Sequence, residues 1–271
     1  MLSRRRFIQA GTIASGAAVT THSNFAEQRC GPLPPSLAGL KSMKDQASPI
    51  SRDERRDRQE KARRLMEANN LDAILLMEGT SLAYFTGVQW HGGERLFAMV
   101  LPAKGMAFYV CPAFEEGRAR EQIANAPEAE KADIRVWQED ENPYQRIGQG
   151  LSDRGIATGS VGMEETVRFV FTEGISKVAP QLRIASATAV TAGSRMIKSD
   201  HEIALMRLAS KVTLAAYEAA YHALKEGMTQ QQFEDLIEAA HKQLGFSGGA
   251  DVQVGEYSAL PHGSVAPQLI R

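Results

Sequence analysis

The sequence has few cysteines and almost no net charge. Its two cysteines, Cys30 and Cys111, cannot build a disulfide framework, and neither has a second cysteine or a histidine at metal-ligand spacing. The 31 basic and 32 acidic side chains leave a formal net charge of −1, so charge favours no nucleic-acid partner. Hydrophobic residues at 43% and charged residues at 23% are typical of globular proteins and exclude a disordered, collagen-like or multi-span membrane chain.

Residues 1–26 have the composition of an export signal. The string SRRRFIQ at positions 3–9 is followed by small and weakly apolar residues over 10–19, an order that resembles a twin-arginine signal. The apolar run is too short, and too rich in glycine, serine and threonine, to span a bilayer. We therefore expect recognition by the twin-arginine export machinery, cleavage near Ala26 and a periplasmic or secreted protein. A basic tail without structure is the alternative.

The next segments predict a leader and then a mixed-sheet domain. Residues 27–50 contain several prolines and glycines without periodicity, which is typical of a flexible leader. Ser51 and Glu54 form a capping box at the start of a charged helix, and a domain is expected over residues 51–190. Alternating strands and helices, with one hairpin turn at 102–105, predict an α/β (α+β) fold with a mixed sheet covered by helices. The expected strands are 71–77, 96–101, 106–111, 134–137, 160–163 and one ending near 187; helices are expected around 114–123 and 144–151 and before the last strand.

The pattern changes after a seam at residues 188–198, and a second domain is expected over 191–271. Capping boxes at Ser199 and Thr229 predict two antiparallel helices joined by a short loop containing Gly227. Their apolar residues recur at helical spacing. On the first helix the buried face is predicted to hold Ile203, Met206, Val212, Ala216 and Ala219. Residues 251–254 have strand character.

Several short sequence motifs together resemble one family. They are the apolar run 71–77, YFTG at 84–87, ER at 94–95, RMIKSDHEI at 195–203 and SALPHG at 258–263. In this order and spacing they resemble the prolidase, aminopeptidase P and creatinase family. The resemblance implies a creatinase/prolidase-type N-terminal mixed-sheet domain followed by the beginning of a "pita-bread" catalytic domain of peptidase family M24.

The resemblance also implies a chemistry. Family members hydrolyse the bond before proline in dipeptides or peptides, using a water that bridges two divalent ions (manganese, cobalt or zinc) held by two Asp, one His and two Glu. His262 matches the family's active-site histidine, which lies beside the metals and hydrogen-bonds the substrate. We therefore take His262 as the candidate catalytic and substrate-binding residue. A homodimer or higher homo-oligomer is implied.

The sequence ends nine residues after His262, and all five family metal ligands lie downstream of that histidine. No metal ligand is therefore assigned, and this chain alone is expected to be inactive and to bind no metal ion. We expect the N-terminal portion of a longer exported Xaa-Pro metallopeptidase. Two alternatives stay open. One is a non-catalytic binding or dimerisation module; the other is a metal-free, creatinase-like hydrolase in which the equivalent histidine is the acid and base.

Other residues that could bind a ligand or take part in catalysis are expected to have structural roles. No partner at ligand spacing accompanies His201, His222 or His241. Residues 90–93 (WHGG) are expected as an ordinary exposed loop, with capping of a neighbouring subunit's active site as the alternative. Near the seam, Arg195 and Lys198 are expected to pair with nearby acids rather than to bind an anion.

Overall fold

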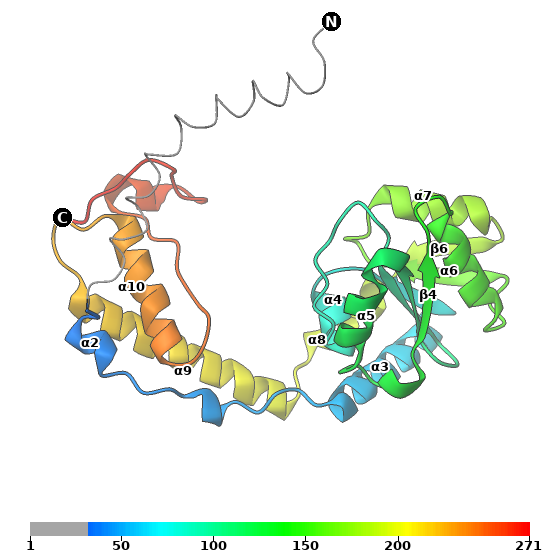
Figure 1. The fold of residues 1–271 in the computed structure, drawn as a ribbon, viewed down its shortest axis with the longest axis horizontal. Helices are drawn as coiled ribbons and strands as arrows, with labels where there is room; N and C mark the ends of the chain where they lie inside the picture. The colour runs from blue at the N-terminus through cyan, green and yellow to red at the C-terminus, as the bar shows by residue number, and fades with distance from the viewer. Residues whose placement is uncertain (1–31) are drawn as a thin grey trace, which may run out of the picture. The chain divides into compact units, whose positions relative to one another are not determined.

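The computed structural model describes residues 32–271, so the predicted export signal lies outside the described residues. These residues fall into two compact units (Figure 1). The N-terminal unit comprises residues 48–203, and the C-terminal unit comprises residues 204–271 together with the segment up to residue 47. In the described part of the chain, no helix is both long and apolar enough to cross a bilayer.

A six-stranded mixed sheet forms the centre of the N-terminal unit, as predicted. Its strands lie in the order β4-β3-β2-β1-β5-β6. The pairs β1–β2 and β2–β3 are antiparallel, with the predicted hairpin between β2 and β3, whereas β3–β4, β1–β5 and β5–β6 are parallel. The strands are β1 (Ala73–Leu76), β2 (Ala98–Pro102), β3 (Phe108–Pro112), β4 (Asp133–Trp137), β5 (Gly159–Met163) and β6 (Leu182–Ser186).

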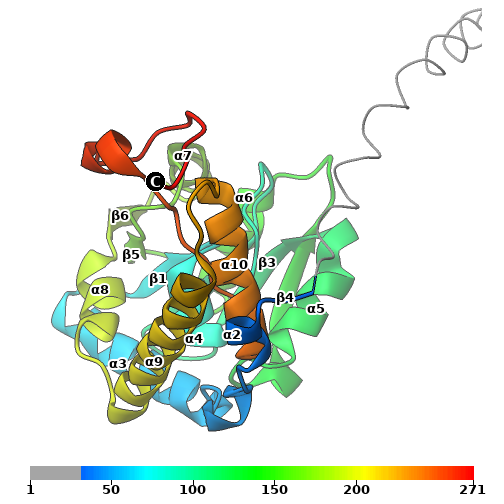
Figure 2. The ribbon, with the colours of Figure 1, turned by 90° about the vertical axis from the view of Figure 1, so that its left-hand side faces the viewer.

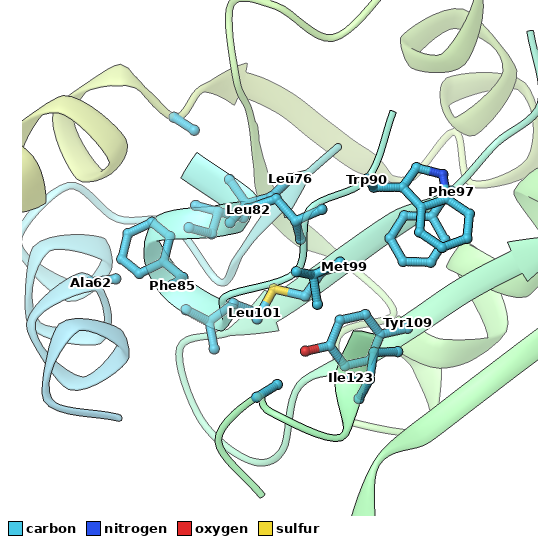
Figure 3. Packing of buried hydrophobic residues seen from close by; sticks show 14 of the residues in the cluster. Ala62, Leu76, Leu82, Phe85, Trp90, Phe97, Met99, Leu101, Tyr109 and Ile123 are labelled. Carbon is cyan, nitrogen blue, oxygen red and sulfur yellow. The ribbon is translucent and has the colours of Figure 1, made fainter. Parts of the chain in front are cut away.

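Helices cover both faces of this sheet. Successive residues of β1 point to opposite faces, so Ile74 belongs to one buried cluster and Leu75 to the other. Both faces are therefore apolar, which explains why the central strands form nearly continuous hydrophobic runs. Figure 3 shows the cluster under α3, α4, α5 and α8. The helices are α3 (Arg52–Ala68), α4 (Thr80–Thr86), α5 (Glu116–Ile123), α6 (Pro143–Ser152), α7 (Phe169–Val178) and α8 (Thr188–Met196).

The predicted seam at residues 188–198 is largely helix α8, and α8 packs against α3. Val190 is fully buried in the same cluster as Ala62 and Met66 of α3. The expected domain boundary between residues 190 and 191 is therefore too early, and the two units meet in the chain at residues 203 and 204. Because α8 carries a buried apolar face, it belongs to the N-terminal unit.

Two helices form most of the C-terminal unit, as predicted. The long helix α9 (Asp200–Ala223) begins in the N-terminal unit, and α10 (Gln230–Gln243) follows after a turn in which Gly227 has φ of +84°. Both predicted capping boxes form, at Ser199 and at Thr229. Met206, predicted on the buried face, is instead 55% exposed, because the packed part of α9 begins at Leu208.

The flexible leader expected over 27–50 does not describe residues 32–47. This segment contains the helix α2 (Pro35–Ala38) and a 3₁₀ turn, η2 (Lys44–Gln46), and it packs on the two helices of the C-terminal unit. Figure 2 shows α2 beside α10. Leu37 and Met43 supply the apolar contacts that anchor it, at 0% and 9% exposure.

The strand predicted at residues 251–254 does not form. Instead, the Val252 amide donates to the Glu234 carboxylate at 2.7 Å, and the Val254 amide donates to the Gln268 side chain at 2.6 Å. These side chains satisfy amides that a neighbouring strand would otherwise bind. The 3₁₀ turn η5 (Gly255–Ala259) follows and leads to the string that contains His262.

Candidate functional site

The candidate catalytic histidine lies in a tight turn of the C-terminal unit, directly after η5. His262 is exposed, and the turn is closed by the Gly263 amide, which donates to the Leu260 carbonyl at 3.0 Å. Gly263 has φ of +71°, a left-handed conformation that favours glycine. His262 lines a cavity of about 650 Å³ together with residues of α10 and of the segment after it, including Gln230, Gln231, Glu234, Asp251 and Gln253.

Three glutamines fix the turn. Gln253 accepts two hydrogen bonds through its side-chain oxygen, from the Ser264 amide at 2.9 Å and from the Gln268 side chain at 2.8 Å. Gln268 is 3% exposed, and its backbone amide donates to the side-chain oxygen of Gln230 at 2.7 Å. This network was not predicted from the sequence. Neutral amides carry no charge pattern, and the three glutamines match no motif.

The cavity is polar and carries negative charge. Glu234 and Asp251 line it with His262, and one Glu234 oxygen already accepts the Val252 amide. An exposed imidazole beside carboxylates can exchange hydrogen bonds with a polar ligand, and the carboxylates favour a positively charged group such as a peptide amino terminus. The geometry therefore suits a small polar molecule better than an apolar one.

The metal pair implied by the resemblance would need several carboxylate and imidazole side chains that converge on one point. Among residues 32–271, no group of three or more His, Cys, Asp or Glu side chains is placed to hold a metal ion. Glu234, Asp251 and His262 share the cavity but do not converge on one point within it. The described residues therefore do not fit a two-metal centre.

Two other histidines have the structural roles predicted for them. His241 is 3% exposed, and its Nδ1 donates to the Ile237 carbonyl at 2.8 Å. His201 bonds the Glu54 carboxylate at 2.6 Å through Nδ1 and the Ser48 carbonyl at 3.0 Å through Nε2. The hydrogen bond to Glu54 raises the pKa of His201. Since both partners accept hydrogen bonds, the imidazole is held in its doubly protonated form.

His222, the third histidine expected to be structural, lies exposed in the last turn of α9, with its ring 6.0 Å from that of Tyr221.

The expected exposed loop at 90–93 is wrong for its aromatic residue. Trp90 is only 8% exposed and stacks on Phe97, with ring centroids 3.8 Å apart (Figure 3). The guanidinium of Arg118 lies over the Trp90 ring, 5.0 Å from its centroid. Because its ring is part of the core, Trp90 is not available to cap a neighbouring active site.

The pairing expected near residues 195–198 is only partly found. Arg195 reaches an acid through a hydroxyl: it donates to Ser81 Oγ at 2.8 Å, and Ser81 donates to Glu164. Burial raises the pKa of Glu164. Lys198 is exposed, and its ammonium contacts the Met196 carbonyl at 3.4 Å rather than an acid.

Comparison with protein families identifies both units. Residues 58–197, more than half of the chain, match the creatinase/prolidase N-terminal domain. The chain belongs to the creatinase/prolidase family. Residues 204–271 match metallopeptidase family M24. The predicted family and the predicted α/β fold are therefore confirmed, and the gap between the matched ranges coincides with the boundary between the two units.

Individual relatives are moderately similar to this chain. The Bacillus subtilis protein YkvY is 29% identical over 204 residues, which cover 74% of this chain and 54% of YkvY. An uncharacterized peptidase of Schizosaccharomyces pombe, C18A7.01, is 26% identical over 88% of this chain and 53% of its own length. The structure of a Pyrococcus horikoshii dipeptidase aligns with a TM-score of 0.66 and 28% identity, over 79% of this chain and 58% of the dipeptidase. The chain spans about half the length of the curated relatives it matches.

Proposed function

We propose that the whole protein is an exported metallopeptidase that hydrolyses the bond before proline. This chain supplies its N-terminal domain and the beginning of its catalytic domain. The match of residues 204–271 to metallopeptidase family M24 carries the proposal, because it includes the SALPHG string and its histidine. The similarity of the Pyrococcus horikoshii dipeptidase supports a small peptide as substrate.

His262 is the residue of this chain to which we give a direct role in the reaction. Its imidazole lines a polar cavity and is exposed to a ligand, so it can hydrogen-bond the peptide as negative charge develops on the scissile carbonyl oxygen. Glu234 and Asp251 in the same cavity favour the positively charged amino group of a dipeptide. The two divalent ions of the proposed enzyme need ligands that the described residues do not offer.

The first test uses the protein isolated from its own cells. We expect it to release proline from Xaa-Pro dipeptides in the presence of manganese, cobalt or zinc. His262→Ala should lower kcat by about 10²–10⁴-fold while the bound metal content stays unchanged, because the imidazole contacts the substrate and not the metal. The matched control is His222→Ala, which removes an exposed imidazole of α9 and should leave both quantities unchanged.

Either of two results would contradict this function. Metal-loaded protein without hydrolysis of any Xaa-Pro peptide would favour the binding or dimerisation module instead. Equal loss of metal and activity in His262→Ala would remove the substrate-contacting role of His262. The intact mass of the isolated protein should be measured in the same preparation, since the part of this chain that aligns spans only about half the length of the curated relatives.

Export is tested separately from catalysis. Replacing Arg4 and Arg5 together by lysine should abolish the periplasmic fraction of the protein, since the proposed signal requires the arginine pair. The control Arg6→Lys makes the same chemical change one residue later and should leave export intact. Equal export of both variants would overturn the twin-arginine assignment without affecting the peptidase proposal.

A further inference from the structure

A segment that precedes the N-terminal unit fills a groove in the C-terminal unit. We call residues 35–46, which include α2 and η2, the strap. The strap lies outside both matched family ranges, 58–197 and 204–271. Because residues 48–203 separate it from α9 and α10, the C-terminal unit is built from two distant pieces of chain.

Apolar packing anchors the strap between the two helices. Leu37 has no exposed surface, and Met43 has 9%. The groove that receives them is made mainly of small residues, which leave space for a leucine between the helices. The buried residues of this cluster on α9 and at α10 are Val212, Ala216, Ala219, Ala223, Ala240 and Leu244.

Hydrogen bonds fix the position of the strap on each helix. Ser36 Oγ donates to the Ala219 carbonyl of α9 at 2.9 Å. The Met43 amide donates at 2.9 Å to the carbonyl of Leu244, the C-cap residue of α10, which has no partner within the helix. Next to it, Gly245 has φ of +88°, and a Cβ there would lie 2.6 Å from Ser42 Oγ, so both the backbone conformation and the close approach of the strap favour glycine. The strap therefore both packs on α10 and caps its end.

The chain directly after the strap is also fixed by a hydrogen bond. Directly after the strap the chain enters the N-terminal unit, where the Ser48 carbonyl accepts a hydrogen bond from His201 at 3.0 Å. His201 lies in the first turn of α9, just before the chain leaves the same unit at residues 203 and 204. The chain thus passes between the units twice, and the hydrogen bond between His201 and Ser48 lies within the N-terminal unit.

We propose that the strap binds the groove between α9 and α10 through its own contacts, as an intramolecular ligand that holds the two helices together. The bond between residues 48 and 49 is then not needed to keep it in place. This inference concerns the stability of the C-terminal unit and is independent of the proposed peptidase activity.

The experiment cuts the chain behind the strap. A site-specific protease sequence is inserted between Ser48 and Pro49 of the full chain, the folded protein is cleaved, and size-exclusion chromatography follows the strap fragment over time. We expect the fragment to stay with the rest of the protein. Leu37→Ala should release it about 30-fold faster or more, the factor that corresponds to the lower end of the cost of truncating a buried leucine.

The matched control is Leu33→Ala, the same change at a neighbouring leucine that is 40% exposed, and it should release the fragment at the parent's rate. Release at once from the parent protein, or equal rates for the two leucine variants, would overturn the proposal. If the cleaved protein aggregates, hydrogen exchange of the Met43 amide in the uncut chain replaces the release assay. Protection of that amide should then fall about 30-fold or more in Leu37→Ala only, and unchanged protection would equally refute the strap.

Discussion

Two glycines of α6, Gly148 and Gly150, should respond to alanine with opposite signs. In both positions alanine favours the helical state by about 0.5–1 kcal/mol, because glycine loses more backbone freedom on folding. A Cβ on Gly148 meets no atom within 4 Å, so the full gain is expected. A Cβ on Gly150 would lie 2.3 Å from the ring of Phe108, which is fully buried.

The steric term decides the sign at Gly150. Ordinary contact needs about 1 Å more space than is present, and the Phe108 ring is confined by the guanidinium of Arg154, 4.4 Å from its centroid. Overpacking of this kind costs about 1–3 kcal/mol, and the severity of the overlap places Gly150→Ala at the upper end. After the helical gain is subtracted, Gly150→Ala should destabilise by about 2 kcal/mol, whereas Gly148→Ala should stabilise by up to about 1 kcal/mol.

Urea unfolding followed by tryptophan fluorescence measures the difference. The two tryptophans of the chain, Trp90 and Trp137, are both buried in the N-terminal unit, so their emission reports on the unit that contains α6. Phe108→Leu, which makes room beside Gly150, should recover part of the loss in the double variant. A shift of the same sign and size for both glycines, or no coupling with Phe108→Leu, would refute the close contact.

Two further predictions concern the junction of α3 and α9. Glu202→Ala should destabilise the N-terminal unit by about 2–4 kcal/mol in the same assay, because it removes a capping-box acceptor and a largely buried ion pair with Arg58 at 2.8 Å. Glu218→Ala on the same helix is exposed and should change stability by less than about 0.5 kcal/mol; similar losses in both would contradict the pairing. Hydrogen bonds from the Ser51 backbone and then from His201 lower the pKa of Glu54 from 4.5 to about 2, whereas Glu54 raises the pKa of His201 above 6.5. Their contribution to stability should therefore be full between about pH 4.5 and 6.5, fall towards pH 2, and fall as the pH rises through the raised pKa of His201. His201→Gln should flatten the alkaline part of this profile, and an unchanged profile would exclude the pair.

Local patterns in the sequence predicted most elements. The three capping boxes, at Ser51, Ser199 and Thr229, form as expected, because each joins residues only three positions apart. The strands were found because short apolar runs between turns remain visible whatever the sheet order is. His241 was placed correctly since helical spacing put it near the apolar face of α10.

Predictions failed where the partner of a segment lies outside that segment. The WHGG loop at 90–93 has a polar, glycine-containing composition, yet the Trp90 ring stacks on Phe97 in the core. Residues 251–254 have strand composition, but no strand lies beside them in the described residues, and glutamine and glutamate side chains bind their amides instead. The pairing of Arg195 with an acid passes through Ser81, a hydroxyl without a charge signal.

The sequence by itself determined most of the helices and strands, the family and the choice of His262 as the candidate site residue, since these depend on neighbours in the chain and on short motifs. Only the tertiary structure decided the strand order, the glutamine network around His262 and the docking of the strap. Ser36 and Ala219 are 183 residues apart, and no local sequence pattern predicts the hydrogen bond between them. The composition of the strap is that of a flexible leader, but its one buried leucine, Leu37, packs in a groove of mainly small side chains. That groove exists only once α9 and α10 have packed, so the sequence of the strap alone does not predict its docking.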